Sequence, residues 1–244
     1  MQEQEKSSKA NNNTCSRTDE YAYIKSYMFV KGFAVAKNLR QTLIALSIAR
    51  QFHNGQYRND GLPYIIHPLK VCTTLISYGI DDDITLSAAL LHDLLEDCKD
   101  SLPLKGQELI CEYHLSEEVL EIVELLTKKS GLTNEELSIY FNKIQGNYRA
   151  ALIKLSDRLH NCSSLYTFSP QRMNKYIKET EQFLIPMASY CKKYYPDYVN
   201  AFTILKTSIF ALNNSMKTML EKYGPEIPST PILQISQVTT SLKH

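Results

Sequence analysis

Residues 88–97 read Ala-Ala-Leu-Leu-His-Asp-Leu-Leu-Glu-Asp and predict the interior of an apolar helix that carries four titratable groups. Charged groups next to a protein core are costly unless they are paired or bind a metal ion. Positions three and four apart share a helix face, so His92 neighbours Glu96, and Asp93 neighbours Glu96 and Asp97. For His92-Asp93 or Glu96-Asp97 alone, an amphipathic helix with a solvated acidic end stays an open alternative. The occurrence of both pairs, one helical turn apart, favours a functional site.

Outward from this segment, apolar residues recur at helical spacing over residues 20–224, and no run alternates as a strand does. The pattern predicts an all-α fold, a helical bundle of roughly nine to ten helices in one domain. The expected helices cover about 20–36, 38–53, 68–78, 83–98, 104–114, 117–129, 134–145, 147–163, 170–194 and 197–222. The polar residues 1–19 and the proline-containing residues 225–244 predict two mobile tails.

Capping residues support several of these bounds. Thr133 and Glu136 have the spacing of a capping box. Ser169 followed by Pro170 predicts an N-cap and a first helical residue.

The composition narrows the class of protein. A net charge of +1 over 244 residues lacks the electrostatic footprint of a general nucleic-acid binder. The six cysteines stand singly without Cys-x-x-Cys spacing, which predicts reduced thiols. No stretch approaches the roughly 20 apolar residues that cross a bilayer, and the N-terminus lacks an apolar signal region. We expect a soluble cytoplasmic protein without nucleic-acid or membrane partners, and the sequence leaves a homo-oligomer open.

A second motif, residues 58–71, places a histidine next to a predicted helix start. Asn59-Asp60-Gly61 is a turn signal, and Pro68 suits the first helical position. His67 would then be the N-cap residue, where the helix dipole favours the neutral imidazole that a metal ion needs. Taken alone, however, His67 is more often a packed or capping histidine than a ligand.

A third motif, residues 152–164, brings polar residues to helical spacing. Asp157 and Asn161 share one face, and Lys154 lies one turn earlier. An ordinary surface helix with local ion pairs is the alternative interpretation.

Together, the motifs supply two imidazoles and two carboxylates for one divalent ion: His67, His92, Asp93 and Asp157. This mixed nitrogen and oxygen set suits Mn²⁺, Fe²⁺ or Zn²⁺ better than Ca²⁺ or Mg²⁺. Glu96 and Asp97 are placed to orient or deprotonate an attacking water. Arg58 and Lys154 are suited to a phosphate group, or to stacking on a base. The residues therefore predict metal-assisted phosphoester hydrolysis.

The order His…His-Asp…Asp resembles the HD-domain phosphohydrolase superfamily. Longer matches are similar to the hydrolase domain of RelA/SpoT proteins, which include stand-alone small alarmone hydrolases and the metazoan SpoT homologue. These matches are Arg58…Gly61-x-Pro63-Tyr64-Ile65-Ile66-His67-Pro68, His92-Asp93-x-x-Glu96-Asp97, Lys154-Leu155-Ser156-Asp157-Arg158-Leu159-His160-Asn161, and Lys178-Glu179-Thr180 with Ile185-Pro186-Met187-Ala188. The similarity runs over about residues 40–190.

The resemblance implies a helical fold and removal of the 3′-pyrophosphate from guanosine tetra- or pentaphosphate, which leaves GDP or GTP. It implies four ligands, usually for Mn²⁺: His67, His92, Asp93 and Asp157. Glu96 and Asp97 match the catalytic acidic pair, and Arg58 matches the arginine that stacks on guanine. The expected substrate-binding residues are Arg58, Tyr64, Lys154, Asn161 and Ser164. Only about 56 residues follow Ala188, too few for the family's synthetase domain, so synthesis is not expected.

The chain departs from the family at residues expected to contact the substrate. Asn59-Asp60 stands where the family usually has Lys-Ser, and Ser163 stands where it usually has Arg. Two positive charges are lost and one negative charge is added. A phosphate contact to an ionised donor contributes about 1.5–3 kcal/mol. With two such donors lost, we expect a polyanionic nucleotide to bind more than about tenfold more weakly.

Two alternatives stand beside a guanosine polyphosphate hydrolase. One keeps the metal chemistry with another nucleotide, such as NADPH through its 2′-phosphate. The other is a non-catalytic nucleotide-binding or regulatory module on the same fold. The complete set of metal-type and acidic residues argues against this second alternative.

Overall fold

The computed structural model describes residues 17–58, 60–98, 112–164 and 168–224. Within these ranges the chain is predominantly helical and forms no strand, apart from one isolated bridge between Tyr57 and Pro63. The predicted all-α fold is confirmed. Both predicted tails and the predicted helix 104–114 lie wholly or largely outside the described residues.

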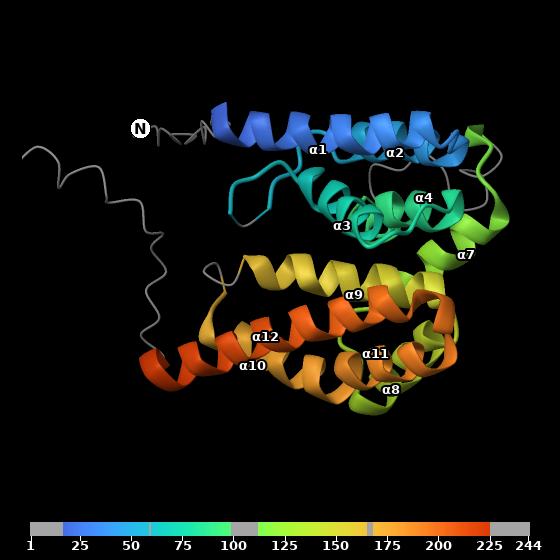
Figure 1. Cartoon of the computed structure of the whole chain (residues 1–244). Coiled ribbons are helices and arrows are strands. Elements are labelled where there is room, and N and C mark those ends of the chain that lie inside the picture. The colour runs from blue at the N-terminus through green and yellow to red at the C-terminus, as the bar shows by residue number, and fades with distance from the viewer. Residues whose placement is uncertain (1–16, 59, 99–111, 165–167, 225–244) are drawn as a thin grey trace, which may run out of the picture.

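The helices form two groups that pack against each other through α3 and α9 (Figure 1). The first group contains α1 (Arg17–Ala36), α2 (Arg40–Phe52), α3 (Ile66–Ser77), α4 (Asp83–Leu91) and the short α5 (Leu94–Asp97). The chain continues through α7 (Glu117–Leu126), α8 (Asn134–Gln145), α9 (Tyr148–Ser163), α10 (Pro170–Glu179), a π-helical turn (Thr180–Leu184), α11 (Ile185–Tyr194), a 3₁₀ turn (Pro196–Tyr198) and α12 (Val199–Tyr223). Figure 1 shows α7 at one end, between the two groups.

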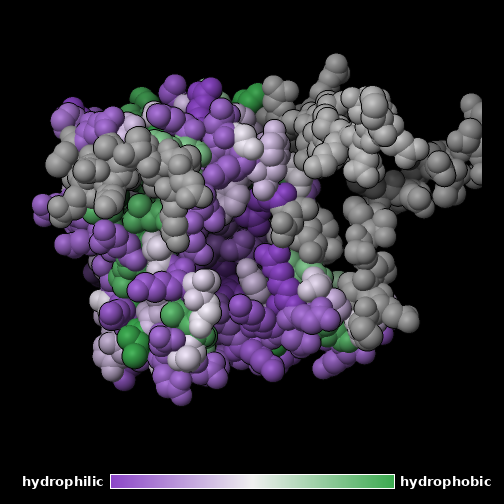
Figure 2. Space-filling model, turned by 180° about the vertical axis from the view of Figure 1, so that it is seen from behind, coloured by the Kyte–Doolittle hydropathy of each residue, from purple (hydrophilic) through white to green (hydrophobic). Residues whose placement is uncertain are grey.

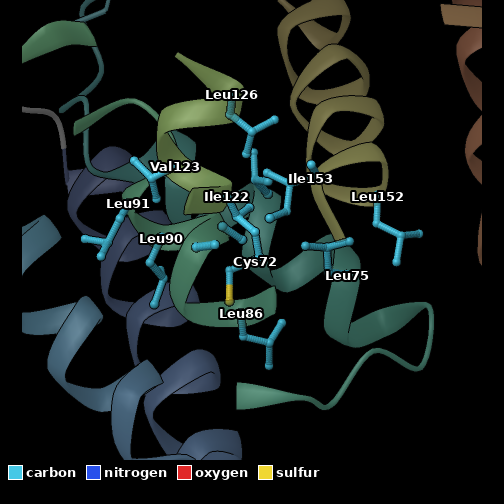
Figure 3. Packing of buried hydrophobic residues seen from close by; sticks show 14 of the residues in the cluster. Cys72, Leu75, Leu86, Leu90, Leu91, Ile122, Val123, Leu126, Leu152 and Ile153 are labelled. Atoms are coloured by element: carbon cyan, nitrogen blue, oxygen red, sulfur yellow. The ribbon is translucent and has the colours of Figure 1, made fainter. Parts of the chain in front are cut away.

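The core lies where α3, α4, α7 and α9 meet (Figure 3). Its fully or almost fully buried side chains include Cys72, Leu75, Leu86, Leu90, Ile122, Leu152 and Ile153. Burial of each large apolar side chain contributes about 1.5–3 kcal/mol. Because this core joins α3, α4 and α9, it fixes the relative positions of the three helices whose residues carry the sequence motifs.

The prediction of one continuous helix over residues 83–98 is wrong. The helix is interrupted at His92 and Asp93, between α4 and α5. Adjacent residues of an unbroken helix do not face each other. At this interruption His92 Nε2 lies 3.2 Å from Asp93 Oδ2, and both residues keep main-chain dihedral angles of the right-handed helical region.

The start predicted for the helix at 68–78 is also wrong. The helix α3 begins at Ile66, with Ile65 at its N-cap, so His67 is the second helical residue and is not the cap. The carbonyl oxygen of Tyr64 accepts the His67 main-chain amide at 2.8 Å, which extends the helical turn before Pro68.

Two of the predicted caps are confirmed. Thr133 and Glu136 form a capping box at α8, and the Ser169 side chain accepts the Arg172 amide at the start of α10. The predicted helix 170–194 is instead interrupted by the π-helical turn, which inserts a wider turn that the apolar spacing does not reveal.

Candidate metal centre and substrate cavity

Four side chains converge on one point. His67 comes from the first turn of α3, His92 and Asp93 from the break after α4, and Asp157 from α9. His67 Nε2 lies 3.2 Å from His92 Nε2, 3.2 Å from Asp93 Oδ2 and 3.3 Å from Asp157 Oδ1. His92 Nε2 lies 3.9 Å from Asp157 Oδ1. The structure thus brings all four expected ligands together.

Donor atoms of His67, His92 and Asp93 all lie within 4.8 Å of one another, which fits one metal ion, and Asp157 lies beside the two histidines. Donor atoms about 2.1 Å from an ion lie about 3.0–3.5 Å from one another in octahedral or tetrahedral geometry. His92 Nδ1 lies 2.9 Å from the carbonyl oxygen of Ala89, which holds a proton on Nδ1. Burial acts to lower the pKa of His92, but the nearby carboxylates, Asp93 first, raise it to about 9, so a metal ion would displace the second proton from Nε2. The residues present therefore fit a divalent metal.

A further histidine, His160, orients His67. Its Nδ1 lies 2.7 Å from His67 Nδ1. Burial, and then the charge of His67, lowers the pKa of His160 to about 3, so His160 is neutral and its Nδ1 accepts the His67 proton. That bond leaves His67 Nε2 free to bind a metal. This role of His160 was not predicted, although its position three residues after Asp157 was a usable signal.

We expect His160→Phe to weaken Mn²⁺ binding about 10–100-fold, because it removes the acceptor that fixes the His67 ring. His160→Asn should keep most of the affinity, since its side-chain oxygen replaces the acceptor. Isothermal titration calorimetry of the two variants beside the wild type measures the difference. Wild-type affinity in the phenylalanine variant would contradict this role.

Both ligand carboxylates are stabilised as anions. Burial acts to raise the pKa of Asp93, but the charges and hydrogen bonds of the protonated His92 and His67 rings, whose place a bound cation would take, outweigh it and hold the pKa well below its usual value. Burial also acts to raise the pKa of Asp157, and the charge of Lys154 leads the groups that lower it. Both side chains are therefore ionised at neutral pH, as metal ligands must be.

Tyr64 and Lys154 each contact a ligand carboxylate as well as the cavity. The Tyr64 hydroxyl donates a hydrogen bond to Asp93 Oδ2 at 2.7 Å, and Lys154 Nζ donates one to Asp157 Oδ2 at 3.1 Å. Both residues line the same cavity as His67, Asp93 and Asp157. They therefore orient the carboxylates in addition to the substrate contact that the sequence predicts.

Glu96 and Asp97 lie in α5, one turn after Asp93, and line that cavity. Glu96 Oε2 accepts a hydrogen bond from the main-chain amide of Lys128 at 3.2 Å. Partial burial raises the pKa of Glu96, against the lowering effects of the Lys128 amide and the Lys154 charge. A carboxylate with a raised pKa beside metal ligands is suited to accept and hold a proton.

Arg58, Asn161 and Ser164 line a second, smaller cavity. Arg58 Nη2 donates a hydrogen bond to Asn161 Oδ1 at 3.1 Å. Asn161 Nδ2 in turn donates to Asp157, which connects the small cavity to the metal ligands. The structure thus places the three expected substrate residues together at one side of the metal centre.

Two of the departures from the family pattern, Asp60 and Ser163, do not line the main cavity. Asp60 Oδ2 is 4.0 Å from Arg58 Nε, and both residues line the small cavity. Ser163 is exposed, and its hydroxyl donates to the carbonyl oxygen of His160 at 2.6 Å. Asn59 lies outside the described residues. The added negative charge of Asp60 therefore balances Arg58 and does not enter the cavity around the metal ligands.

The two cavities have volumes of about 470 Å³ and 180 Å³, and Tyr64, Asn161 and Arg172 line both. A hollow lined by hydrophilic residues is visible on the face of the molecule in Figure 2. Six cationic side chains line the larger cavity: Lys128, Lys129, Lys154, Arg158, Arg172 and Lys175. Four of these cations were not predicted from the sequence, because the segment after α7 (Lys128, Lys129) and α10 (Arg172, Lys175) reach the cavity only through the packing of the helices.

The fold and the converging side chains define a helical protein with a candidate metal site of the type His, His-Asp, Asp. The HD domain family matches residues 45–189, and the chain belongs to this family. The matched range contains the four candidate ligands and both acidic residues of α5.

Several curated relatives have a named activity. The chain is 36% identical over 152 residues to guanosine-3′,5′-bis(diphosphate) 3′-pyrophosphohydrolase of Borreliella burgdorferi, a match that covers 59% of this chain and 22% of the relative. It is 38% identical over 149 residues to the protein of the same name in Aquifex aeolicus, covering 59% and 20%. It is 31% identical over 210 residues to the bifunctional (p)ppGpp synthase/hydrolase SpoT of Escherichia coli K12, covering 78% and 28%. The chain thus spans about a quarter of the length of these relatives.

One solved structure shares the fold. It is described as a metazoan ortholog of SpoT that hydrolyzes ppGpp, and it superimposes with a TM-score of 0.56 at 22% identity. The match covers 72% of this chain and 94% of that one. At this identity the likeness concerns the fold alone.

Proposed function

We propose that the protein is a metal-dependent hydrolase that removes the 3′-pyrophosphate of guanosine polyphosphates and leaves GDP or GTP plus pyrophosphate. The convergence of the four ligand side chains next to Glu96 and Asp97, inside a cation-lined cavity, carries the proposal. The named activity of the bacterial relatives supports the same reaction.

In this proposal His67, His92, Asp93 and Asp157 hold the ion, and we infer that it is Mn²⁺ because the ligands mix imidazole nitrogen with carboxylate oxygen. The bound ion supplies a Lewis acid for the phosphate oxygens and acidifies the attacking water. Glu96, with Asp97 beside it, orients that water and takes its proton. The cations of the cavity stabilise the negative charge of the departing pyrophosphate.

The small cavity suits a guanine base. Arg58 provides a planar guanidinium for stacking, and Tyr57 and Phe168 provide aromatic rings. The Asp60 carboxylate accepts hydrogen bonds, and guanine offers ring and amino N–H donors on one edge where adenine lacks the matching pair. This chemistry supports a guanosine nucleotide over an adenosine nucleotide.

The cations around the large cavity offset the charges lost from the family pattern. Arg172 extends between the two cavities, and its guanidinium lies 4.0 Å from the Phe168 ring centroid. Lys129 and Lys175 have no carboxylate partner among the ion pairs of the described residues. These groups are suited to the phosphates of a polyanionic nucleotide, so the substitutions at Asn59, Asp60 and Ser163 do not argue against such a substrate.

We infer a cytoplasmic location. Cys72, Cys162 and Cys191 are buried thiols, which suits a reducing compartment. Among the described helices, none has the length and apolar composition that a membrane crossing requires.

A nucleotide panel tests the proposal. Mn²⁺-loaded protein should release pyrophosphate from guanosine tetraphosphate, and excess chelator should abolish the release. The adenosine counterpart should react at least about tenfold more slowly, because it leaves the acceptor in the small cavity unpaired. Separate assays for pyrophosphate and orthophosphate identify the products.

The same panel separates the two alternatives. Release of orthophosphate from NADPH, without pyrophosphate from the guanosine nucleotide, would replace the substrate while keeping the metal chemistry. Tight nucleotide binding without any product, in protein with confirmed metal, would favour a regulatory module.

A further inference from the structure

Glu179, the last residue of α10, joins two cations from distant parts of the chain. Its Oε2 accepts a hydrogen bond from Lys128 Nζ at 2.7 Å, and its Oε1 accepts one from Arg158. The Glu179 side chain is only 10% exposed, so these pairs are less screened by solvent than ion pairs on the surface. The carboxylate therefore fixes both cations in place.

Lys128 connects this ion-paired group to the candidate acid. It follows α7 in a segment without regular secondary structure. Its main-chain amide donates the 3.2 Å hydrogen bond to Glu96 Oε2. A main-chain amide outside a helix is held in place by the contacts of its neighbours and of its own side chain. The hydrogen bond from Lys128 Nζ to Glu179 is such a contact.

The helix that carries Glu96 needs support of this kind. α5 has only four residues, and so short a helix gains little from its own hydrogen bonds. At its other side, Gln56 Nε2 donates to the Asp97 carbonyl oxygen at 3.3 Å. The direct contact to the Glu96 carboxylate comes from Lys128.

We propose that Glu179 is a positioning residue that holds Glu96 at the metal site through Lys128. The contacts run from the Glu179 carboxylate to the Lys128 side chain, and from the Lys128 amide to Glu96. Glu179 also pairs with Lys128 and Arg158, two cations that would otherwise attract substrate phosphates. Its loss should therefore misplace Glu96 while leaving more free positive charge in the cavity. The kinetic consequence rests on the proposed function, whereas the contact itself does not.

Glu179→Gln tests the proposal with a side chain of the same size. We expect kcat to fall about tenfold, as for one lost hydrogen bond, while KM stays equal or falls. In nucleotide-free protein, hydrogen exchange of the Lys128 amide, measured by NMR, should become faster. Glu181→Gln is the matched control: Glu181 is two residues further on, 43% exposed, and pairs with Lys217 away from the site.

Two Lys128 variants keep the test decisive if Glu179→Gln does not fold. Lys128→Met removes the side-chain partner and should speed exchange of the residue 128 amide, whereas Lys128→Arg should restore the protection. Unchanged exchange in Glu179→Gln or Lys128→Met would overturn the proposal, as would an effect of Glu181→Gln equal to that of Glu179→Gln. If the wild type hydrolyses no nucleotide, the proposed function fails, and the exchange of this amide still decides the contact.

Discussion

Asp93→Asn should abolish metal binding and lower kcat/KM for the guanosine polyphosphate at least about a thousandfold. Asp93 Oδ2 lies 3.2 Å from the Nε2 atoms of both His67 and His92, at the centre of the donor set. Asparagine keeps the shape and an acceptor for the Tyr64 hydroxyl, but it removes the negative charge. Metal content by inductively coupled plasma mass spectrometry and pyrophosphate release measure the two effects.

Asp81→Asn is the matched control for this change. Asp81 is exposed and pairs with Lys37 at 2.9 Å on the surface, so its loss should leave metal content and turnover unchanged. A thermal melt of both variants checks that they are folded. Full metal content in Asp93→Asn would show that the converging side chains are not the ligands.

The candidate ligand residues could be predicted from the sequence because each is a polar group in a recognisable context. His92 and Asp93 interrupt an apolar run, and Asp157 has an asparagine one turn later. The interruption of the helix at these residues could not be predicted. Nothing at positions 92 and 93 resembles a helix breaker, since neither glycine nor proline is present, and both residues keep right-handed helical dihedral angles at the short interruption.

Local signals predicted helix bounds well where the stabilising bond is itself local. The capping box of Thr133 and Glu136 lies within four residues and was predicted correctly. The start of α3 was placed two residues late, because the turn at Tyr64 to His67 already satisfies its main-chain amides before the proline. The π-helical turn at Thr180–Leu184 left no signature in the apolar spacing.

The electrostatics of the cavity were the least predictable part. The sequence indicated a loss of positive charge at Asn59 and Ser163, whereas the folded chain brings Lys129, Arg172 and Lys175, which lie outside the three motifs, to the large cavity. Motif comparison counts charges along the chain. Binding depends on which charges share a cavity, and this is decided by how α7, α9 and α10 pack.

Glu96→Gln should lower kcat about 10²–10⁴-fold and leave metal content unchanged. Glutamine keeps an acceptor for the Lys128 amide, so the change removes the proton-accepting charge and little else. Glu118→Gln is the control, because Glu118 is a partly exposed residue of α7 that pairs with Arg149 at 2.7 Å. Metal-loaded turnover and metal content are measured on both variants.

The pH dependence of the wild type provides the second measurement on Glu96. Only the ionised carboxylate accepts a proton, so activity is present above the Glu96 pKa and is lost as the pH falls through it. Because partial burial raises that pKa from the ordinary 4.5, the acidic limb of kcat should lie above pH 4.5. A limb below this value, or wild-type turnover in Glu96→Gln, would remove Glu96 from proton transfer. Loss of turnover with metal retained, beside loss of both in Asp93→Asn, would separate the catalytic carboxylate from the ligands.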